Sequence, residues 1–483
     1  MKNYILSIDQ STSSSKGFLV DRNGGIVRRA AYPHKQYYPA DGRAEHDAEE
    51  IFRNVLTLLE ELSDGVPDEI AAVSIANQRE TTVLWERDTG KAVCPAIVWQ
   101  DVRGRDVCRE FSEADRAYVL NASGMALSPY YPAAKVAQLF RERPELRVRA
   151  ERGDVCMGTI ESWLVFRLTG RHVSDLSNAS RTQLLNLREL RWDEGLVSRF
   201  GLPLSLLPET LLPTDGDFGT WKGIPITGVL GDSHATLFGQ GCVTPGSVKV
   251  SYGTGSSVMM NIGPVPSISE TGSLSTAVAF RYNGQTHYQT EGNITCSCDT
   301  LVWLCREMGI FENEQEIERL AGTVPDSLGV CLVPALSGLG APFFDVDARA
   351  IICGLSRGAT KAHRARAALE GVVQRDADVA EAMAEFCGQA PQYMMADGGG
   401  AKNALMMQMQ ADLANCEVRC SAASELSALG AAYMAGLKTG LYASLDDIPA
   451  RQVPQTVYRP RMSAEERLRM RKMWADAIRK SRP

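Results

Sequence analysis

The feature that most constrains the fold is a pattern that occurs twice: an apolar strand, a turn rich in Ser, Thr and Gly, and a second apolar strand. The first copy covers residues 4–20 and the second covers residues 246–260. A repeated supersecondary unit indicates a duplicated core, and a chain of 483 residues is too long for a single core. We therefore predict two α/β domains, residues 1–244 and residues 245–483.

A second constraint is the junction between residues 231 and 232. The apolar run from Ile224 to Leu230 ends in Gly231 and Asp232, and a segment of small residues with helical character follows. This order places Asp232 where a strand meets the N-terminus of a helix, which is where α/β folds concentrate their chemistry. An aspartate at this point is either a plain helix N-cap or a catalytic acid, and its own pattern favours the N-cap.

Two further strands end in polar clusters. The apolar run 71–75 is followed by residues 77–81, Asn-Gln-Arg-Glu-Thr, and the run 96–98 is followed by Trp99, Gln100 and Asp101. Charged clusters at the ends of buried strands are typical of functional sites. The sequence therefore predicts that both clusters contribute to one functional site.

Helix signals occur in both halves of the chain. Asp47 with Glu50 resembles a capping box at the start of a helix, and Ser463 with Glu466 forms another before the terminal helix. Further helices are predicted over residues 366–383, residues 401–413 and residues 425–437.

Composition excludes several classes of protein. A net charge of −7 without a basic patch argues against nucleic-acid binding. The apolar runs are too short to span a membrane, and the apolar start of the chain meets Asp9 too soon for a signal peptide. The twelve cysteines are scattered without a Cys-x-x-Cys pair, which predicts free and mostly buried thiols. We expect a cytoplasmic protein with no nucleic-acid or membrane partner.

Three turns carry the residues that phosphate groups require. They comprise residues 12–14, residues 254–257 and residues 397–400, and each follows a predicted strand. Glycines and hydroxyls allow backbone N–H groups to approach a phosphate closely. Any one such turn is more often an ordinary turn, but the three together favour a polyphosphate site. None of them matches the Walker A pattern.

Taken in order, the motifs resemble the glycerol kinases of the FGGY carbohydrate kinase family over almost the whole chain. The matching segments are Ile8-Asp9-Gln10-Ser11-Thr12, Asn77-Gln78-Arg79-Glu80-Thr81-Thr82, Ala96-Ile97-Val98-Trp99-Gln100, Asn178-Ala179-Ser180-Arg181-Thr182, Gly231-Asp232, Tyr252-Gly253-Thr254-Gly255, Gly338-Leu339-Gly340-Ala341-Pro342 and Asp397-Gly398-Gly399. The resemblance implies two actin-like, ribonuclease H-like domains that close over a cleft holding Mg-ATP and a small polyol. It assigns the polyol pocket and the first phosphate turn to the N-terminal domain, and nucleotide binding to the C-terminal domain.

The resemblance also implies a role for individual residues. Asp232 would be the general base, and Ser233 would lie beside the substrate. Asp9 would hold Mg²⁺. The residues implied to contact the polyol are Arg79, Glu80, Trp99 and Tyr130, those implied to contact phosphates are Thr12, Ser13, Ser14, Lys16 and Thr254, and those implied to line the adenosine end are Gly399 and Asn403.

The chemistry of a polyol agrees with these roles, because hydroxyl groups need carboxylate acceptors and a donor fork beside an apolar wall. Each residue also has a purely structural interpretation. Arg79 with Glu80 could form a surface ion pair, Trp99 could be a core residue, and Tyr130 could pack the domains together. All of these interpretations at once are far less probable than any one alone.

Two departures from the glycerol kinase pattern concern the polyol end. Ser233 stands where that pattern has Gln, and Ser257 stands where it has an aromatic residue. Both changes remove side-chain volume, which predicts a roomier and more polar pocket. The predicted substrate is glycerol or a related small polyol. A longer polyol or ketose, such as xylulose, ribulose or erythritol, is the alternative.

Other departures affect the nucleotide end and regulation. Ser11 replaces Gly and Lys16 replaces Arg in the first turn, while Cys298 and Val302 replace Gly and Gln. These changes leave the individual phosphate and adenine contacts open. The short connection between Gly219 and Ile224 predicts that a regulatory loop for a sugar bisphosphate is absent.

A chaperone-like or non-catalytic ATPase on the same fold is a second alternative for the function. The sequence leaves the oligomeric state open, and a homodimer is one alternative.

Overall fold

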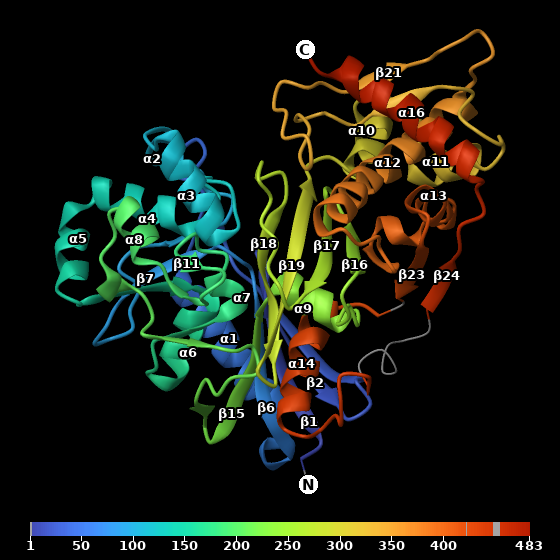
Figure 1. Ribbon diagram of the computed structural model, residues 1–483. Coiled ribbons are helices and arrows are strands. Elements are labelled where there is room, and N and C mark those ends of the chain that lie inside the picture. Colours follow the sequence, from blue (N-terminus) through green and yellow to red (C-terminus); the bar gives the residue numbers. More distant parts are fainter. Residues whose placement is uncertain (1, 422, 448–454) are drawn as a thin grey trace.

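The computed structural model describes residues 2–421, 423–447 and 455–483. Two large sheets form its centre, one of six and one of seven strands. In Figure 1 the first sheet lies at the bottom of the molecule and the second rises beside it, while a lobe of helices lies to the left. The C-terminal helix α16 (Ala464–Ser481) covers the upper right.

The first sheet has the strand order β14-β15-β6-β1-β2-β3. β1 pairs with β2 in antiparallel and with β6 in parallel orientation, and β6 pairs in parallel with β15. The first predicted strand is confirmed, and it extends to Gln10 because Asp9 and Gln10 still pair with Lys16 and Ser15. The strands are β1 (Tyr4–Gln10), β2 (Ser14–Asp21), β3 (Ile26–Pro33), β6 (Ile70–Asn77), β14 (Thr220–Trp221) and β15 (Ile224–Gly231).

The second sheet repeats this arrangement. Its order is β18-β19-β17-β16-β22-β23-β24, with β16 antiparallel to β17 and parallel to β22. The duplicated core predicted from the sequence is thus present as a repeated strand order. The strands are β16 (Ser247–Tyr252), β17 (Ser256–Gly263), β18 (Ser275–Tyr282), β19 (Gln285–Ile294), β22 (Tyr393–Gly398), β23 (Glu417–Ser421) and β24 (Gln455–Tyr458).

Helices cover the outer face of each sheet. α1 (Ala48–Ser63) packs on the first sheet through Ile51, Val55 and Leu58, which are completely buried. α12 (Lys361–Cys387) packs on the second sheet and α13 (Ala404–Ala414) packs beside it. Burial of these apolar faces stabilises both halves, at roughly 25 cal/mol for each Å² of apolar surface removed from water.

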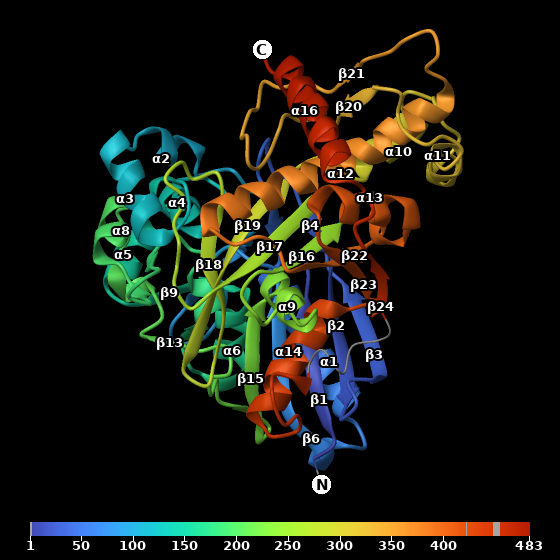
Figure 2. The same ribbon diagram turned by 45° about the vertical axis from the view of Figure 1, so that its right-hand side comes forward.

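Two helices lie between the sheets, and Figure 2 shows them stacked along the centre of the molecule. α9 (Asp232–Gly239) comes from the first half and α14 (Leu426–Lys438) from the second. α14 nevertheless packs against β1, β6 and β15 of the first sheet. One apolar cluster therefore contains residues of both sheets, among them Ile5, Phe18, Met259 and Met395.

Some details of the helix starts differ from the predictions, and the helix predicted over residues 366–383 is longer and begins at Lys361. Asp47 caps α1 by accepting from the backbone of Glu49, but Glu50 does not complete a capping box, because it accepts instead from the backbone N–H of Lys35. The helix expected from residue 401 begins at Ala404, because a short 3₁₀ turn at Gly400–Lys402 precedes it. The capping residue Ser463 of the terminal helix is confirmed.

The helical lobe surrounds a five-stranded sheet in the first half, of order β4-β5-β8-β7-β9. Its strands are β4 (Gln36–Tyr37), β5 (Glu45–His46), β7 (Thr82–Glu86), β8 (Ala96–Ile97) and β9 (Val155–Thr159). Its helices are α2 (Arg105–Arg109), α3 (Glu113–Ser123), α4 (Pro132–Glu142), α5 (Pro144–Glu151), α6 (Ile160–Thr169), α7 (Leu176–Ala179) and α8 (Glu194–Arg199). The remaining elements are β10 (Val173–Asp175), β11 (Leu185–Asn186), β12 (Arg191–Trp192), β13 (Thr210–Leu212), β20 (Cys331–Val333), β21 (Ile351–Cys353), α10 (Asp299–Arg306) and α11 (Glu314–Ala321).

Two predictions from composition can be compared with the structure. The twelve cysteines are all free thiols, as predicted, but only five are buried and seven are partly exposed, so the prediction that most are buried is wrong. Within the described ranges, none of the helices has the length and apolar character that a membrane crossing requires.

Candidate active site

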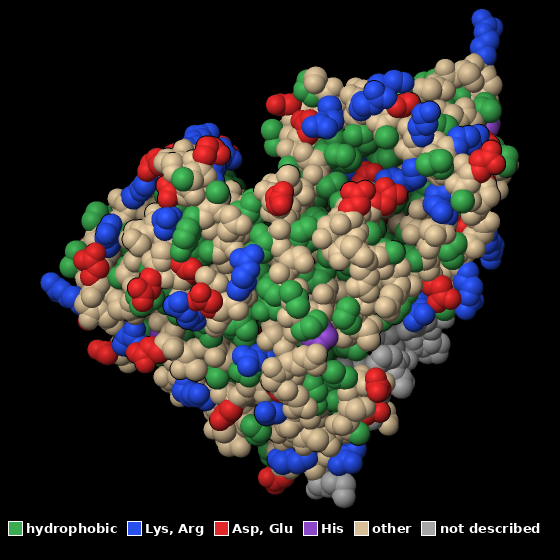
Figure 3. Space-filling model, in the orientation of Figure 1, with side chains coloured by type: hydrophobic (Ala, Val, Ile, Leu, Met, Phe, Trp, Pro, Cys, Tyr) green, Lys and Arg blue, Asp and Glu red, His purple; other side chains and the backbone are tan. Residues whose placement is uncertain are grey.

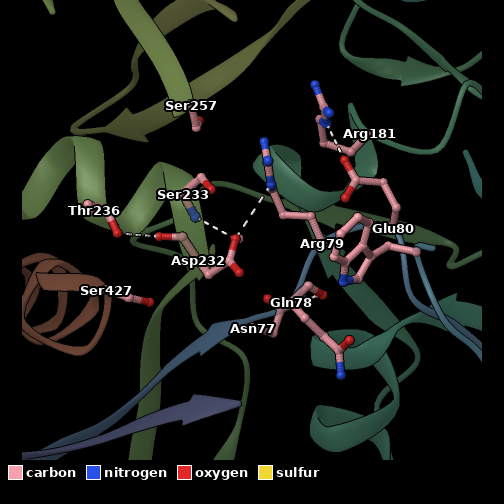
Figure 4. A network of polar contacts seen from close by, with 12 residues as sticks. Asn77, Gln78, Arg79, Glu80, Arg181, Asp232, Ser233, Thr236, Ser257 and Ser427 are labelled. Carbon is pink, nitrogen blue, oxygen red and sulfur yellow. Dashed lines mark hydrogen bonds and ion pairs between the residues drawn. The ribbon is translucent and has the colours of Figure 1, made fainter. Parts of the chain in front are cut away.

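The site begins at the end of β15, where Asp232 is the first residue of α9. Gly231 is the residue at the N-cap position, and Asp232 uses Oδ1 to accept from the backbone of Ser233 at 2.6 Å. The interpretation of Asp232 as a plain N-cap is therefore wrong. Its carboxylate is 35% exposed and lies 3.5 Å from Nε of Arg79 (Figure 4).

The second contribution comes from the end of β6. Asn77 exchanges side-chain hydrogen bonds of 3.0 and 2.9 Å with Asn178, and the backbone of Gln78 donates to Gln10 of β1. Glu80 adopts a φ of 60°, which is uncommon for a residue with a side chain. The surrounding hydrogen bonds hold this left-handed turn, so that the side chains of Arg79 and Glu80 leave it in fixed directions.

Arg79 and Glu80 belong to a buried network of four charges. Arg79 donates to both oxygens of Glu291 at 3.0 and 2.9 Å, and Arg181 contacts Glu291 at 3.0 Å. Arg181 also pairs with Glu80 at 2.5 Å. None of the four residues is more than 8% exposed, so the interpretation of Arg79 and Glu80 as a surface ion pair is wrong.

Glu291, Arg79 and Arg181 keep their charges across the physiological pH range. The pKa of Glu291 lies far below its ordinary value, because the guanidinium groups of Arg79 and Arg181 together outweigh the effect of burial. Burial alone would lower the pKa of Arg79, but the carboxylate of Glu291 raises it well above its ordinary value. Arg79 is therefore a permanent cation beside Asp232.

Trp99 and Tyr130 form the next part of the site. Their rings meet edge to face at 5.9 Å, and the hydroxyl of Tyr130 donates to Glu80 at 3.3 Å. Trp99 is only partly buried, and its indole N–H donates to the hydroxyl of Thr12 at 3.0 Å. Trp99 is therefore not a core residue. Lys135 fixes the adjacent backbone by donating to the carbonyls of Val98 and Trp99, both at 2.9 Å.

Ser233 on α9 and Ser257 on β17 face the same space, one from each half of the molecule. Figure 4 shows the Ser257 side chain directed from its strand toward Ser233 and Arg79. The hydroxyl of Ser257 lies 3.5 Å from Glu291. The sequence analysis had placed both serines near the substrate, and the structure brings them together with Arg79.

Asp9 lies at the end of β1 and is 6% exposed. Burial, together with the negative charge of Asp232, raises its pKa to about 7. The hydroxyl of Ser427 on α14 donates to Asp9 at 3.3 Å. Partial burial raises the pKa of Asp232 as well, although Arg79 opposes the shift. Two acids with raised pKa values thus lie close together between the two halves.

The first phosphate turn is short, since β1 and β2 leave only three residues between them. Thr12 and Ser14 are partly buried and Ser13 is exposed. Lys16 is occupied by an ion pair of 2.9 Å with Glu425, the residue before α14.

The second and third turns meet at a cavity of about 770 Å³. Thr254, Gly399 and Asn403 all line it, together with Cys298 and Val302. Glycine is required at Gly255 and Gly398, because a Cβ at either position would lie 2.3 Å from a backbone carbonyl oxygen. Neither the residues of the first turn nor Arg79 and Asp232 line this cavity, so the cavity is distinct from the space around Arg79 and Asp232.

Figure 3 shows the molecule hollowed between its upper left and upper right lobes. Within the described ranges, no group of three or more His, Cys, Asp or Glu residues could hold a metal ion by itself. Within the same ranges, Asp9 therefore belongs to no group of three or more such donors. Mg²⁺ commonly needs no more than one or two carboxylates when phosphate groups and water complete its coordination, so the donor set is compatible with that ion.

Sequence reasoning missed four residues of this site as functional candidates. Arg181 had appeared only within a matching motif, and Ser427 had not been singled out. Glu291 and Lys249 gave the clearest signal, since each is the only charged residue of its strand. A single charged residue in an otherwise uncharged strand is a sequence pattern from which Glu291 and Lys249 could have been predicted as functional residues.

Comparisons with known proteins agree with this site. Residues 4–239 match the N-terminal domain of the FGGY family of carbohydrate kinases, and residues 248–439 match its C-terminal domain. Glycerol kinase 1 of Thermotoga maritima is 42% identical over 489 residues, covering 99% of each chain.

Solved structures extend the comparison to the fold. The glycerol kinase of Plasmodium falciparum, solved with ADP, superposes with a TM-score of 0.95 at 32% identity, covering 99% of this chain and 98% of that one. The gluconate kinase of Lactobacillus acidophilus superposes with a TM-score of 0.89 at 24% identity, covering 99% and 97%, and supports the fold alone. The predicted fold class and the predicted resemblance are both confirmed. The chain belongs to the FGGY family of carbohydrate kinases.

Proposed function

We propose that the protein transfers the γ-phosphoryl group of ATP to a hydroxyl of glycerol or a related small polyol. The observation that carries this proposal is the position of Asp232, whose carboxylate lies 3.5 Å from the buried guanidinium of Arg79. A proton acceptor beside a fixed hydroxyl-binding cation suits a small alcohol. Relatives named glycerol kinase that match along the whole chain support the same substrate.

On the polyol side, Arg79, Glu80 and Tyr130 bind the hydroxyl groups. Arg79 donates, while Glu80 accepts through the oxygen that Tyr130 approaches. Trp99 supplies the apolar wall against the carbon chain, and Ser233 lies on the opposite side. The contacts of Glu80 with Arg181 and Tyr130 hold this carboxylate in place before the polyol arrives, which reduces the entropy lost on binding.

On the nucleotide side, Thr254, Gly399 and Asn403 line a cavity large enough for a nucleoside. Thr12, Ser13, Ser14 and Lys16 contact the phosphate groups from the first half. The ADP in the related Plasmodium falciparum structure supports this assignment. Lys16 would exchange its ion pair with Glu425 for a phosphate oxygen.

Asp9 would hold Mg²⁺, directly or through water. Its raised pKa fits this role, because a buried carboxylate without a full counter-charge gains most from a divalent cation. A bound magnesium ion supplies positive charge to the phosphate oxygens during transfer.

In the proposed reaction, Arg79 orients the acceptor hydroxyl toward Asp232, and Asp232 removes its proton as the oxygen attacks the γ-phosphorus of ATP. The bond between that phosphorus and the oxygen bridging to the β-phosphate breaks, and ADP leaves with the electron pair. The raised pKa of Asp232 brings its proton affinity closer to that of an effective general base. Two halves that each contribute to the site suit a closing motion that excludes water.

Two further predictions belong to this proposal. They are the division of the chain into domains at residues 244 and 245 and the cytoplasmic location. The oligomeric state stays open, with a homodimer as one alternative. A chaperone-like ATPase is disfavoured, because it would not need the polyol-binding arrangement of Arg79, Glu80 and Trp99.

The test is steady-state formation of ADP by the purified protein with Mg-ATP, with and without glycerol. We expect ADP formation to depend on the polyol and a phosphorylated polyol to accumulate in equal amount. ATP hydrolysis that is the same with and without any polyol would favour the ATPase and contradict the proposal.

A further inference from the structure

Lys249 is a buried cation without an ion-pair partner. It lies on β16, at the face of the second sheet that packs on α9, and is 2% exposed. Among the described residues, no carboxylate oxygen is close enough to its Nζ to form an ion pair. Burying a charged group without close compensation costs several kcal/mol. Such a cost is typical of a functional group rather than a structural one.

The contacts of Lys249 are unusually weak. Its Nζ lies 3.5 Å from the hydroxyl of Ser257 and 3.9 Å from the sulfur of Met259. Lys135, which is equally buried, instead donates to two backbone carbonyls at 2.9 Å. A lysine that is buried to the same degree can therefore make close hydrogen bonds in this fold. The contacts of Lys249 are all longer than those of Lys135.

Lys249 adjoins the polyol end of the site. Ser257 lies 3.5 Å from Lys249 and also 3.5 Å from Glu291, and Glu291 holds Arg79 at 2.9 Å. The polar groups thus form a continuous line from the proposed polyol-binding Arg79 to Lys249. Burial lowers the pKa of Lys249, while the carboxylates of Asp397, Glu291 and Asp232 act against that shift.

We propose that Lys249 and Ser257 together bind an additional oxygen atom of the substrate, beyond the three carbons of glycerol. The substrate class of this site then includes polyols or ketoses of four carbons, whose terminal hydroxyl would accept from the Lys249 ammonium. This inference rests on the proposed function, because it requires a polyol to be held by Arg79 and Glu80.

A substrate oxygen fits this position better than a phosphate of the nucleotide. Neither Lys249 nor Ser257 lines the cavity formed by Thr254, Gly399 and Asn403. Ser257 is directed toward Ser233 and Arg79 in Figure 4, at the polyol end. The serines at positions 233 and 257 occupy less volume than Gln and an aromatic residue would, and the ammonium of Lys249 supplies the donor that a further hydroxyl requires.

The first test measures kcat/KM for glycerol, erythritol and erythrulose. The unaltered full-length protein is compared with two single variants, Lys249→Met and Ser257→Ala. Met keeps most of the volume of Lys but cannot donate. We expect kcat/KM for the better four-carbon substrate to fall by about ten-fold or more in Lys249→Met, mainly through KM, because a hydrogen bond to a charged group is lost. Ser257→Ala should have the same direction of effect and a smaller size. The fall for glycerol should be clearly smaller.

The second test measures thermal unfolding without ligand. Lys249→Met should unfold at a higher temperature than the unaltered protein, because an uncompensated buried charge has been removed. Stabilisation by erythritol in the presence of ADP should be lost in the same variant. Lys222→Met is the matched control, since Lys222 forms an exposed ion pair with Glu60 and a cation–π contact with the Trp221 ring, far from the polyol end, and should change neither result.

The outcomes separate this inference from the proposed function. Phosphorylation of glycerol without phosphorylation of any four-carbon compound would overturn the inference and leave the function intact. Equal losses for glycerol and the four-carbon substrate in Lys249→Met would also overturn it. Failure to phosphorylate any polyol would overturn the proposed function itself.

Discussion

Glu291 provides the sharpest test of how the two halves of the molecule build the site. It lies on β19 of the second sheet, is 2% exposed, and accepts from Arg79 and Arg181, which the first half supplies. We consider Glu291→Gln, which keeps the size of the side chain and removes its charge. Glu80 is then the only remaining carboxylate of the network for two buried guanidinium groups.

The expected loss of stability follows from this charge imbalance. Removing one partner of a buried ion pair costs about 3–5 kcal/mol. Asp232 lies 3.5 Å from Arg79 and can recover part of that cost by drawing the guanidinium toward itself. We therefore expect a loss of about 3 kcal/mol. The exposed pair of Lys222 and Glu60 offers the control, because Glu60→Gln should cost less than about 1 kcal/mol.

The same displacement of Arg79 should impair the polyol specifically. The KM for glycerol should rise by about ten-fold or more, while the KM for ATP should change little, since Arg79 lies outside the cavity lined by Thr254 and Asn403. Urea unfolding and steady-state kinetics measure the two effects. A variant with normal stability and normal KM for glycerol would refute the interpretation of Glu291 as the residue that positions Arg79.

Three further predictions concern the reaction, its specificity and its pH dependence. Asp232→Asn should lower turnover by roughly 10²-fold with nearly unchanged ATP affinity, because Asn holds the hydroxyl but cannot take its proton. Near-normal steady-state turnover in a stably folded variant would contradict the assignment of Asp232 as the base. Replacing Ser233 with Gln and Ser257 with Phe together should shift the ratio of kcat/KM values from longer polyols toward glycerol by roughly ten-fold. An unchanged ratio over a panel of polyols would contradict the role of these two serines. Without metal, the folded state binds a proton at Asp9 more tightly than the unfolded chain does, since its pKa is about 7 rather than 3.8. Its contribution to stability therefore falls as the pH rises through that interval, and thermal unfolding of Asp9→Asn should show a flatter dependence on pH.

Much of the fold was predictable from local patterns. The strands at both copies of the repeated unit, and the helices capped by Asp47 and Ser463, follow from apolar periodicity and from side chains that satisfy nearby backbone groups. The position of Asp232 at the start of α9 was predictable for the same reason. A strand and the helix that follows it are adjacent in sequence.

The electrostatic network of the site depends on tertiary structure. Glu291 is 212 residues from Arg79, and Ser427 is 418 residues from Asp9. These contacts arise only when the two sheets pack on α9 and α14, and no local propensity encodes that packing. The sequence by itself determined which strands, turns and reactive side chains exist. The packing of the two halves decided which charges are buried together, because the energy of a charge depends on the partners and the solvent around it.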